Sequence, residues 1–116
     1  MLKETGLGRL KVHDDVIMAI VEEAALATEG VAHMVSRGVR DDLNQWLKKD
    51  DHGRGVTILV EESTFSIDLY VAVFYRERLA DLGRRLVDRI YEAVDKALGF
   101  GPTRITIHVE GLEMRE

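Results

Sequence analysis

Alternation of apolar and polar residues predicts an antiparallel β-hairpin in the middle of this chain. From Phe65 to Phe74 every second residue up to Val73 is a large apolar one, and a shorter alternating run covers Val56 to Glu61. Strict alternation over such lengths is typical of strands with one buried face. The polar link at 62–64 is short enough to join these two strands as a hairpin.

Apolar residues recur at helical spacing in two other segments. The first begins at Asp14, the expected N-cap, and runs to a turn at Glu29–Gly30. The second covers about residues 77–98 and ends at Gly99, a natural C-terminal cap. The expected buried stripes are Ile17, Ile20, Val21, Ala24 and Ala27 in the first helix, and Leu79, Leu82, Leu86, Ile90, Val94 and Ala97 in the second.

The remaining segments are shorter. We expect a short strand at 7–12, a strand or extended connection at 31–35, and a closing strand at 104–112 that buries Ile105, Ile107 and Val109. Residues 1–6 are polar and expected to be flexible. Residues 36–55 form an irregular segment, in which helical spacing predicts one short amphipathic helix carrying Val39, Leu43, Trp46 and Leu47.

This order of elements predicts an α+β fold. Two main amphipathic helices would pack on one face of a small, mostly antiparallel sheet of three to four strands, as a two-layer sandwich. With 116 residues the chain is long enough for one core and too short for two, so residues 1–116 are expected to form a single domain.

Composition narrows the classes of function. The formal net charge of −5 argues against a phosphate-binding module, because such binding relies on Lys and Arg. The chain contains no cysteine, which excludes disulfides, thiolate nucleophiles and cysteine-ligated zinc. No stretch approaches the ~18 apolar residues of a spanning helix, so we expect a cytoplasmic protein.

No constellation of residues points to catalysis. The histidines lack the spacing of a metal motif, and the paired acids are typical of helix caps or solvated helix faces. The glycine pairs at 6–8 and 53–55 are too short to cradle a phosphate. We therefore expect no catalytic residues, no cofactor and no metal; the histidines are His13, His33, His52 and His108.

Several short segments, in order, resemble the alkaline shock protein family of bacteria. They are the Gly-x-Leu-Lys-Val opening at Gly8–Val12, Val16-Ile17, Glu29-Gly30-Val31, Gly55-Val56, Ile67-Asp68-Leu69 and the closing segment Ile105–Leu112. The resemblance covers about residues 5–112. One position departs from the family pattern, since the family tends to place a glycine after Tyr75 and this chain has Arg76.

The resemblance implies a non-enzymatic protein of Gram-positive bacteria that is linked to cell-envelope homeostasis and stress. It also implies assembly into homo-oligomers and recruitment to the inner face of the membrane by a separate membrane-anchored partner. Residues for such contacts do not follow from the resemblance.

A candidate interaction face follows from the strand pattern instead. If both helices cover one side of the sheet, the other side presents aromatic and apolar residues among polar ones, which is typical of a partner surface. The alternative is that residues 36–55 fold over this patch. Its members are Leu59, Tyr70, Phe74 and His108.

A rival interpretation uses the arginine-rich start of the second helix. These side chains could contact an anion such as an RNA backbone or a lipid headgroup, although no Gly-x-x-Gly clamp of the KH type is present. Alternatively they form a solvated face that nearby aspartates neutralise. The residues are Arg78, Arg84, Arg85 and Arg89.

Overall fold

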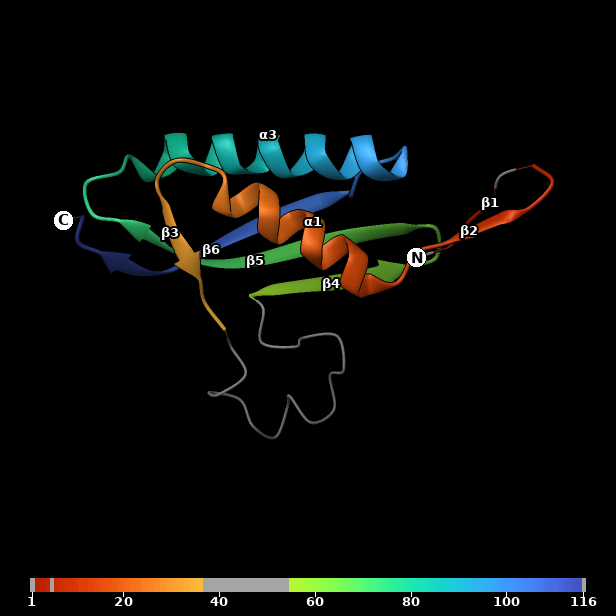
Figure 1. Ribbon diagram of the computed structural model, residues 1–116, viewed down its shortest axis with the longest axis horizontal. Helices are drawn as coiled ribbons and strands as arrows, with labels where there is room; N and C mark the ends of the chain where they lie inside the picture. Colours follow the sequence, from red (N-terminus) through yellow and green to blue (C-terminus); the bar gives the residue numbers. More distant parts are fainter. Residues whose placement is uncertain (1, 5, 37–54, 116) are drawn as a thin grey trace.

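The strand β5, Thr64–Phe74, is the centre of the main sheet, and every other strand of that sheet pairs with it (Figure 1). The computed structural model describes residues 2–4, 6–36 and 55–115. Strand β6, Arg104–Glu113, runs parallel to β5 along one edge, because the helix between them crosses over one face of the sheet. The strands on the other edge of β5 are antiparallel to it, which confirms the predicted hairpin.

Two short strands share that other edge of β5, one after the other. Strand β3, Val31–Met34, pairs with the end of β5, and strand β4, Val56–Glu61, pairs with its beginning. They meet at Tyr70, whose carbonyl accepts from the Val35 amide at 2.9 Å and whose amide donates to the Gly55 carbonyl at 2.8 Å. The chain therefore leaves the sheet and returns to it at a single point. The short helix predicted within 36–55 lies outside the described residues.

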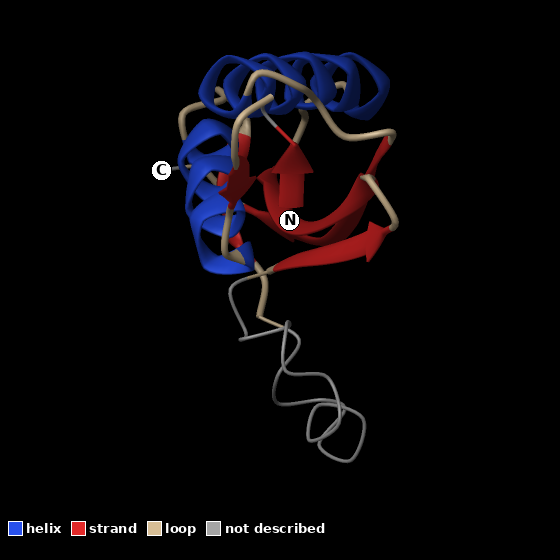
Figure 2. Ribbon diagram, turned by 90° about the vertical axis from the view of Figure 1, so that its right-hand side faces the viewer, coloured by secondary structure: helices blue, strands red, loops and turns tan. Residues whose placement is uncertain are grey.

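Helices α1, Asp14–Leu26, and α3, Leu79–Leu98, pack against each other on one face of the curved sheet (Figure 2). This arrangement confirms the predicted two-layer α+β fold. Alternate residues of β5 face these helices and are almost completely buried, as their pattern predicted. The fully buried large side chains are Phe65, Ile17, Met18, Ile67, Leu69, Leu82, Leu86, Ile90, Val21, Val56, Val71 and Val73.

The ends of the first helix differ from prediction. His13 is the N-cap, because its Nδ1 accepts a hydrogen bond from the Asp15 amide at 3.1 Å, and Asp14 is the first helical residue. The helix ends at Leu26, so Ala27 is exposed and does not extend the buried stripe. Gly30 has a φ of +107° and sits in the turn that leads into β3, not at the helix cap.

Coverage of the sheet by the helices is uneven. Ile105 and Ile107 are only half-buried and Val109 is 43% exposed, although all three were predicted to be buried. The physical reason is that, within the described residues, α1 contacts β3 and β4, whereas the helix that contacts β6 is α3. Leu79, which was also predicted to be buried, is 49% exposed, because it lies in the first turn of α3.

The N-terminal residues form a separate two-stranded ribbon that projects from one end of the sheet (Figure 1). Strand β1, Leu2–Glu4, pairs antiparallel with strand β2, Arg9–Lys11. The predicted strand at 7–12 is therefore present in part, but its partner is a strand that the sequence pattern did not predict. Lys3 connects this ribbon to the domain, with its Nζ 4.7 Å from the centre of the Phe100 ring.

Arg76 occupies the connection between β5 and α3 in a left-handed conformation, with a φ of +79°. This is the position at which the resemblance indicated a glycine. A side chain with a Cβ is strained there, since the Cβ crowds the following carbonyl oxygen. The backbone thus keeps the conformation that suits glycine although the residue is arginine.

Replacing Arg76 with glycine is expected to raise the free energy of unfolding by about 0.5–1 kcal/mol, the relief of left-handed strain less the entropy cost of glycine. Urea denaturation followed by circular dichroism would measure the change. The matched control is Arg76→Ala, which removes the guanidinium but keeps the Cβ and is expected to give no stabilisation. Equal shifts in both variants would contradict the assignment of strain to the backbone.

Candidate functional site

The face of the sheet that points away from the helices carries the residues predicted to contact a partner. On β5, alternation turns Tyr70 and Phe74 to this outer face, and the parallel register places His108 of β6 beside Tyr70. Leu59 of β4 lies opposite Ser66 and is 55% exposed. Ser66 and Phe74 are eight residues apart along β5, or about 26 Å. Tyr70 and His108 are thus brought together, whereas Leu59 and Phe74 lie at opposite ends of the face.

Tyr70 and His108 form the best-defined cluster on the outer face. Their rings stack with centroids 4.3 Å apart and an interplanar angle of 13°. The Nε2 of His108 lies 2.9 Å from Oδ1 of Asp68, and this contact holds the imidazole in place. Both side chains are about one-third exposed. Asp68 was a polar position of the predicted strand. Because it lies two residues before Tyr70, the strand pattern places both on the same face and could have identified Asp68 as a neighbour of this pair.

Phe74 lies at the end of the face, where β5 passes into the connection to α3. The guanidinium of Arg115 lies over its ring at 4.2 Å from the ring centre, and also contacts Glu77 at 3.2 Å. This stacking covers part of the aromatic surface with a charged side chain. The sequence pattern could not have placed Arg115 here, because it follows the last strand.

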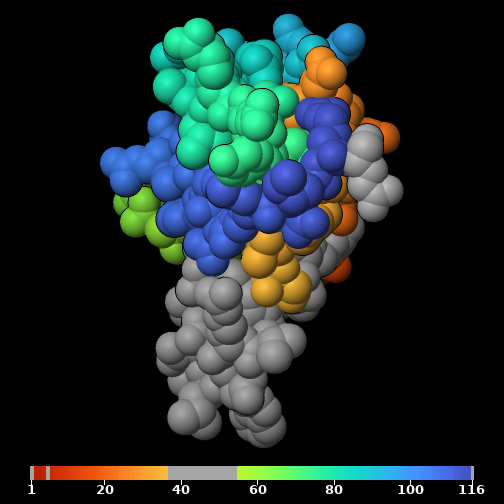
Figure 3. Space-filling model, turned by 90° about the vertical axis from the view of Figure 1, so that its left-hand side faces the viewer, coloured from red at the N-terminus to blue at the C-terminus, as the bar shows by residue number. Residues whose placement is uncertain are grey.

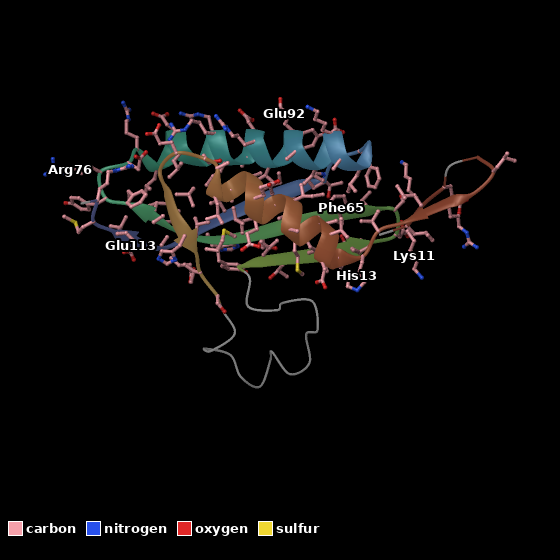
Figure 4. All side chains as sticks on the ribbon, viewed as in Figure 1. Lys11, His13, Phe65, Arg76, Glu92 and Glu113 are labelled. Carbon is pink, nitrogen blue, oxygen red and sulfur yellow. The ribbon has the colours of Figure 1, made fainter. Side chains whose placement is uncertain are left out.

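A second ion pair crosses the same end of the outer face. His33 of β3 places its Nε2 3.3 Å from Oε2 of Glu113 of β6, so the two strands on either side of β5 are connected. Figure 4 labels Glu113 at this end of the sheet. The pKa of His33 is raised by a hydrogen bond to the Met34 carbonyl and by the Glu113 carboxylate. His33 reaches this face because the ladder is irregular between Val31 and His33, which simple alternation cannot predict.

The arginines at the start of α3 do not form one free basic patch. Arg78 and Arg84 both contact Asp81. Arg85 points to a different neighbour, lying 3.5 Å from Glu77 and donating to the Glu29 carbonyl at 3.3 Å. These contacts favour the interpretation as a neutralised, solvated face.

Arg89, the fourth arginine, lies apart from the others in a groove between α1 and α3. The groove encloses about 350 Å³ and has small residues along its floor. The charge of the groove is mixed, because Glu92 lines it together with Arg89 and Lys96. Its lining residues are Ala24, Ala27, Arg89, Glu92, Ala93 and Lys96.

Histidine and carboxylate side chains meet on the outer face in pairs. In the ranges 2–4, 6–36 and 55–115, no group of three or more His, Asp or Glu side chains is placed to hold a metal ion. Neither helix in these ranges is long and apolar enough to cross a membrane.

Comparison with known proteins finds a family and several relatives that match nearly the whole chain. The alkaline shock protein 23 family, described as having a cell envelope-related function, matches residues 2–114. The protein YloU of Bacillus subtilis (strain 168) is 24% identical over 111 residues, covering 95% of this chain and 92% of YloU. Spy1614 of Streptococcus pyogenes serotype M6 is 22% identical over 108 residues, covering 92% of this chain and 89% of that protein.

A further relative and one solved structure extend this picture. YqhY of Bacillus subtilis (strain 168) is 23% identical over 111 residues, covering 96% of this chain and 82% of YqhY. The structure of MamM V260R covers 91% of this chain and 89% of its own, with a TM-score of 0.50 and 12% identity, which is a likeness of fold alone. The match to nearly the whole chain decides the family: the chain belongs to the alkaline shock protein 23 family, whose described function is related to the cell envelope.

Proposed function

We propose that this protein is a non-enzymatic interaction or scaffold protein of cell-envelope homeostasis or stress, and that it acts by association through the outer face of its sheet. It would work in the cytoplasm and reach the inner face of the membrane through a membrane-anchored partner. The family description supports the cellular context. The surface and the partner are our inference.

The observation that carries this proposal is that both helices lie on one side of the main sheet (Figure 2). On the other side, no helix of the described residues covers Leu59, Tyr70 or Phe74. Leu59 is 55% exposed, and the rings of Tyr70 and His108 stack side by side on neighbouring strands of this face. Aromatic side chains of this kind bury a large area at low entropic cost when a partner covers them.

The Asp68–His108 pair supports association better than chemistry. A carboxylate that orients a histidine is one part of a catalytic triad, but among the described residues no hydroxyl group is hydrogen-bonded to the other ring nitrogen of His108 to act as the nucleophile. A structural role for the histidine, in stacking on Tyr70 and bonding to Asp68, accounts for both contacts.

The anion-binding alternative is less favoured, because Arg78, Arg84 and Arg85 already contact acidic side chains or a carbonyl. Retention on immobilised heparin or RNA that falls steeply with salt would support this alternative.

The double variant Tyr70→Ser/Phe74→Ser tests the proposal. We expect the assembly to fall to a smaller mass in sedimentation or light scattering, because two aromatic anchors are lost from the outer face. The matched control is Val16→Ser/Leu26→Ser, which removes two half-exposed apolar side chains from α1 on the opposite layer and should leave the mass unchanged. An unchanged mass in the Tyr70→Ser/Phe74→Ser variant would contradict association through this face.

A further inference from the structure

The last strand, β6, forms one margin of the main sheet. It pairs with β5 along its length, from Arg104 beside Ser66 to Glu113 beside Phe74. In the described part of the chain no strand pairs with its other edge. An edge of this length is a ready template for another strand, because it presents a row of backbone donors and acceptors.

The side chains of β6 that face the helices are also incompletely covered. Their direct neighbours on β5 are almost fully buried, whereas Val109 is 43% exposed and Leu112 is 57% exposed. Ile105 and Ile107 are half-buried. The uncovered apolar band therefore lies directly beside the open strand edge, so that one partner could cover both. In Figure 3 the end of β6, in dark blue, lies at the surface below the segment that leads into α3.

The helix α3 adds an aromatic side chain on the same side. Tyr91 is 46% exposed. Its ring lies against Gly101, in the connection that leads into β6, because a Cβ at Gly101 would be only 2.3 Å from Cε2 of Tyr91. Tyr91 thus extends the apolar band of β6 onto α3.

The charges along β6 favour a particular occupant. The strand begins with Arg104 and ends with Glu110 and Glu113. A copy of the same strand running antiparallel would place Arg104 opposite Glu113 of the second copy, and the reverse at the other end. A copy running parallel would instead bring like charges together, which is destabilising on a sheet.

The direction of the side chains agrees with this register. Arg104 and Glu113 both lie on the outer face, next to Ser66 and Phe74 of β5. One step inward, Ile105 would lie opposite Leu112 of the second copy, on the helix side of the sheet. The irregularity between Val109 and Gly111 divides the strand, so the regular pairs are those of 104–106 with 111–113.

We propose that the free edge of β6 binds a second copy of this chain, antiparallel and about a two-fold axis, to give a continuous sheet across a dimer. The interface would be isologous, with each contact made twice. It uses the free backbone edge of β6, whereas the function proposed above uses side chains of the outer face, so it does not rest on that function.

Charge reversal tests this interface. Arg104→Glu places two carboxylates opposite each other at both ends of the interface, and we expect the dissociation constant of the dimer to rise at least about tenfold in sedimentation equilibrium. Glu113→Arg should weaken the dimer similarly. The double variant Arg104→Glu/Glu113→Arg restores opposite charges between copies and should recover the dimer. Both residues are exposed, and circular dichroism would verify folding.

The double variant carries the decisive evidence. Glu113 also contacts His33 of its own copy, and reversing Arg104 cannot restore that contact. Recovery of the dimer would therefore report the contact between copies. A monomeric wild type, or a double variant that dissociates as far as the sum of the single variants, would overturn the proposal.

The two proposals fail separately. Leu59→Ser, in the outer face but on β4 rather than beside β6, is expected to leave the dimer constant unchanged while reducing larger assemblies. If Arg104→Glu has no effect but the Tyr70→Ser/Phe74→Ser variant still reduces the mass, the edge proposal falls and the proposed function stands.

Discussion

Replacing Gly55 with alanine is expected to lower the free energy of unfolding by about 2–3 kcal/mol, from left-handed strain and overpacking together. Gly55 is buried and has a φ of +81°, a conformation that suits glycine. A Cβ added here would lie 3.0 Å from the Val35 carbonyl oxygen and 3.1 Å from the Tyr70 carbonyl oxygen. Both neighbours are backbone atoms of the sheet, so they cannot rotate away.

The position of Gly55 explains why the effect should be large. Its carbonyl accepts the Tyr70 amide at 2.8 Å, at the point where β3 ends and β4 begins along β5. Movement of Gly55 to relieve the contact would disturb the hydrogen bonds at this point. The substitution is therefore expected to destabilise both β3 and β4.

The matched control is Gly83→Ala in α3, where an added Cβ would meet nothing within 4 Å and φ is not positive. There the same substitution should raise the free energy of unfolding by about 1 kcal/mol, because alanine favours the helix. Chemical denaturation of both variants measures the difference. A Gly55→Ala variant as stable as the wild type would show that the sheet can yield at Tyr70.

Elements with strong periodicity could be predicted from the sequence. The alternation of β5 predicts its buried face, because each inward residue packs under a helix while its neighbour faces outward. The stripe of α3 likewise predicts Leu82, Leu86, Ile90 and Val94 as buried. In both elements burial on one face accounts for the pattern, although Leu79 and Ala97, at the two ends of the predicted α3 stripe, are exposed.

Tertiary context decides what periodicity does not. The pattern of β6 is as regular as that of β5, yet Val109 is exposed, because of the two described helices α3 covers this margin of the sheet and α1 does not. Nothing local predicts that Leu2–Glu4 pairs with β2, since three-residue strands carry too few residues for a period. The start of α1 could not be predicted to the residue either. His13 and Asp14 can both act as an N-cap, and the backbone conformation decides which of them does.

The candidate site also contains contacts that the sequence pattern predicts and contacts that it does not. Alternation places Tyr70 and His108 on the outer face, where the structure stacks them. It does not reveal that Arg115 covers Phe74, or that His33 connects to Glu113, because these contacts join segments far apart in the chain. The arginines could be recognised as a group from their spacing, but their partners Asp81 and Glu77 decide whether they are free.

Replacing Leu86 with alanine is expected to lower the free energy of unfolding by about 3–4 kcal/mol, from the lost transfer free energy and the cavity that remains. Leu86 is completely buried, in the middle of α3 and within the core that joins both helices to the sheet. Residues close-packed on all sides relax little, so the cavity should persist.

Leu79→Ala provides the comparison for this loss, because it is the same substitution in the same helix at a residue that is 49% exposed. It should cost less than about 1 kcal/mol, since little surface is removed from the interior and alanine has a high helix propensity. Urea denaturation at several protein concentrations would separate folding from association. Equal losses at the two positions would mean that Leu79 is covered as completely as Leu86, and would place a partner over the first turn of α3.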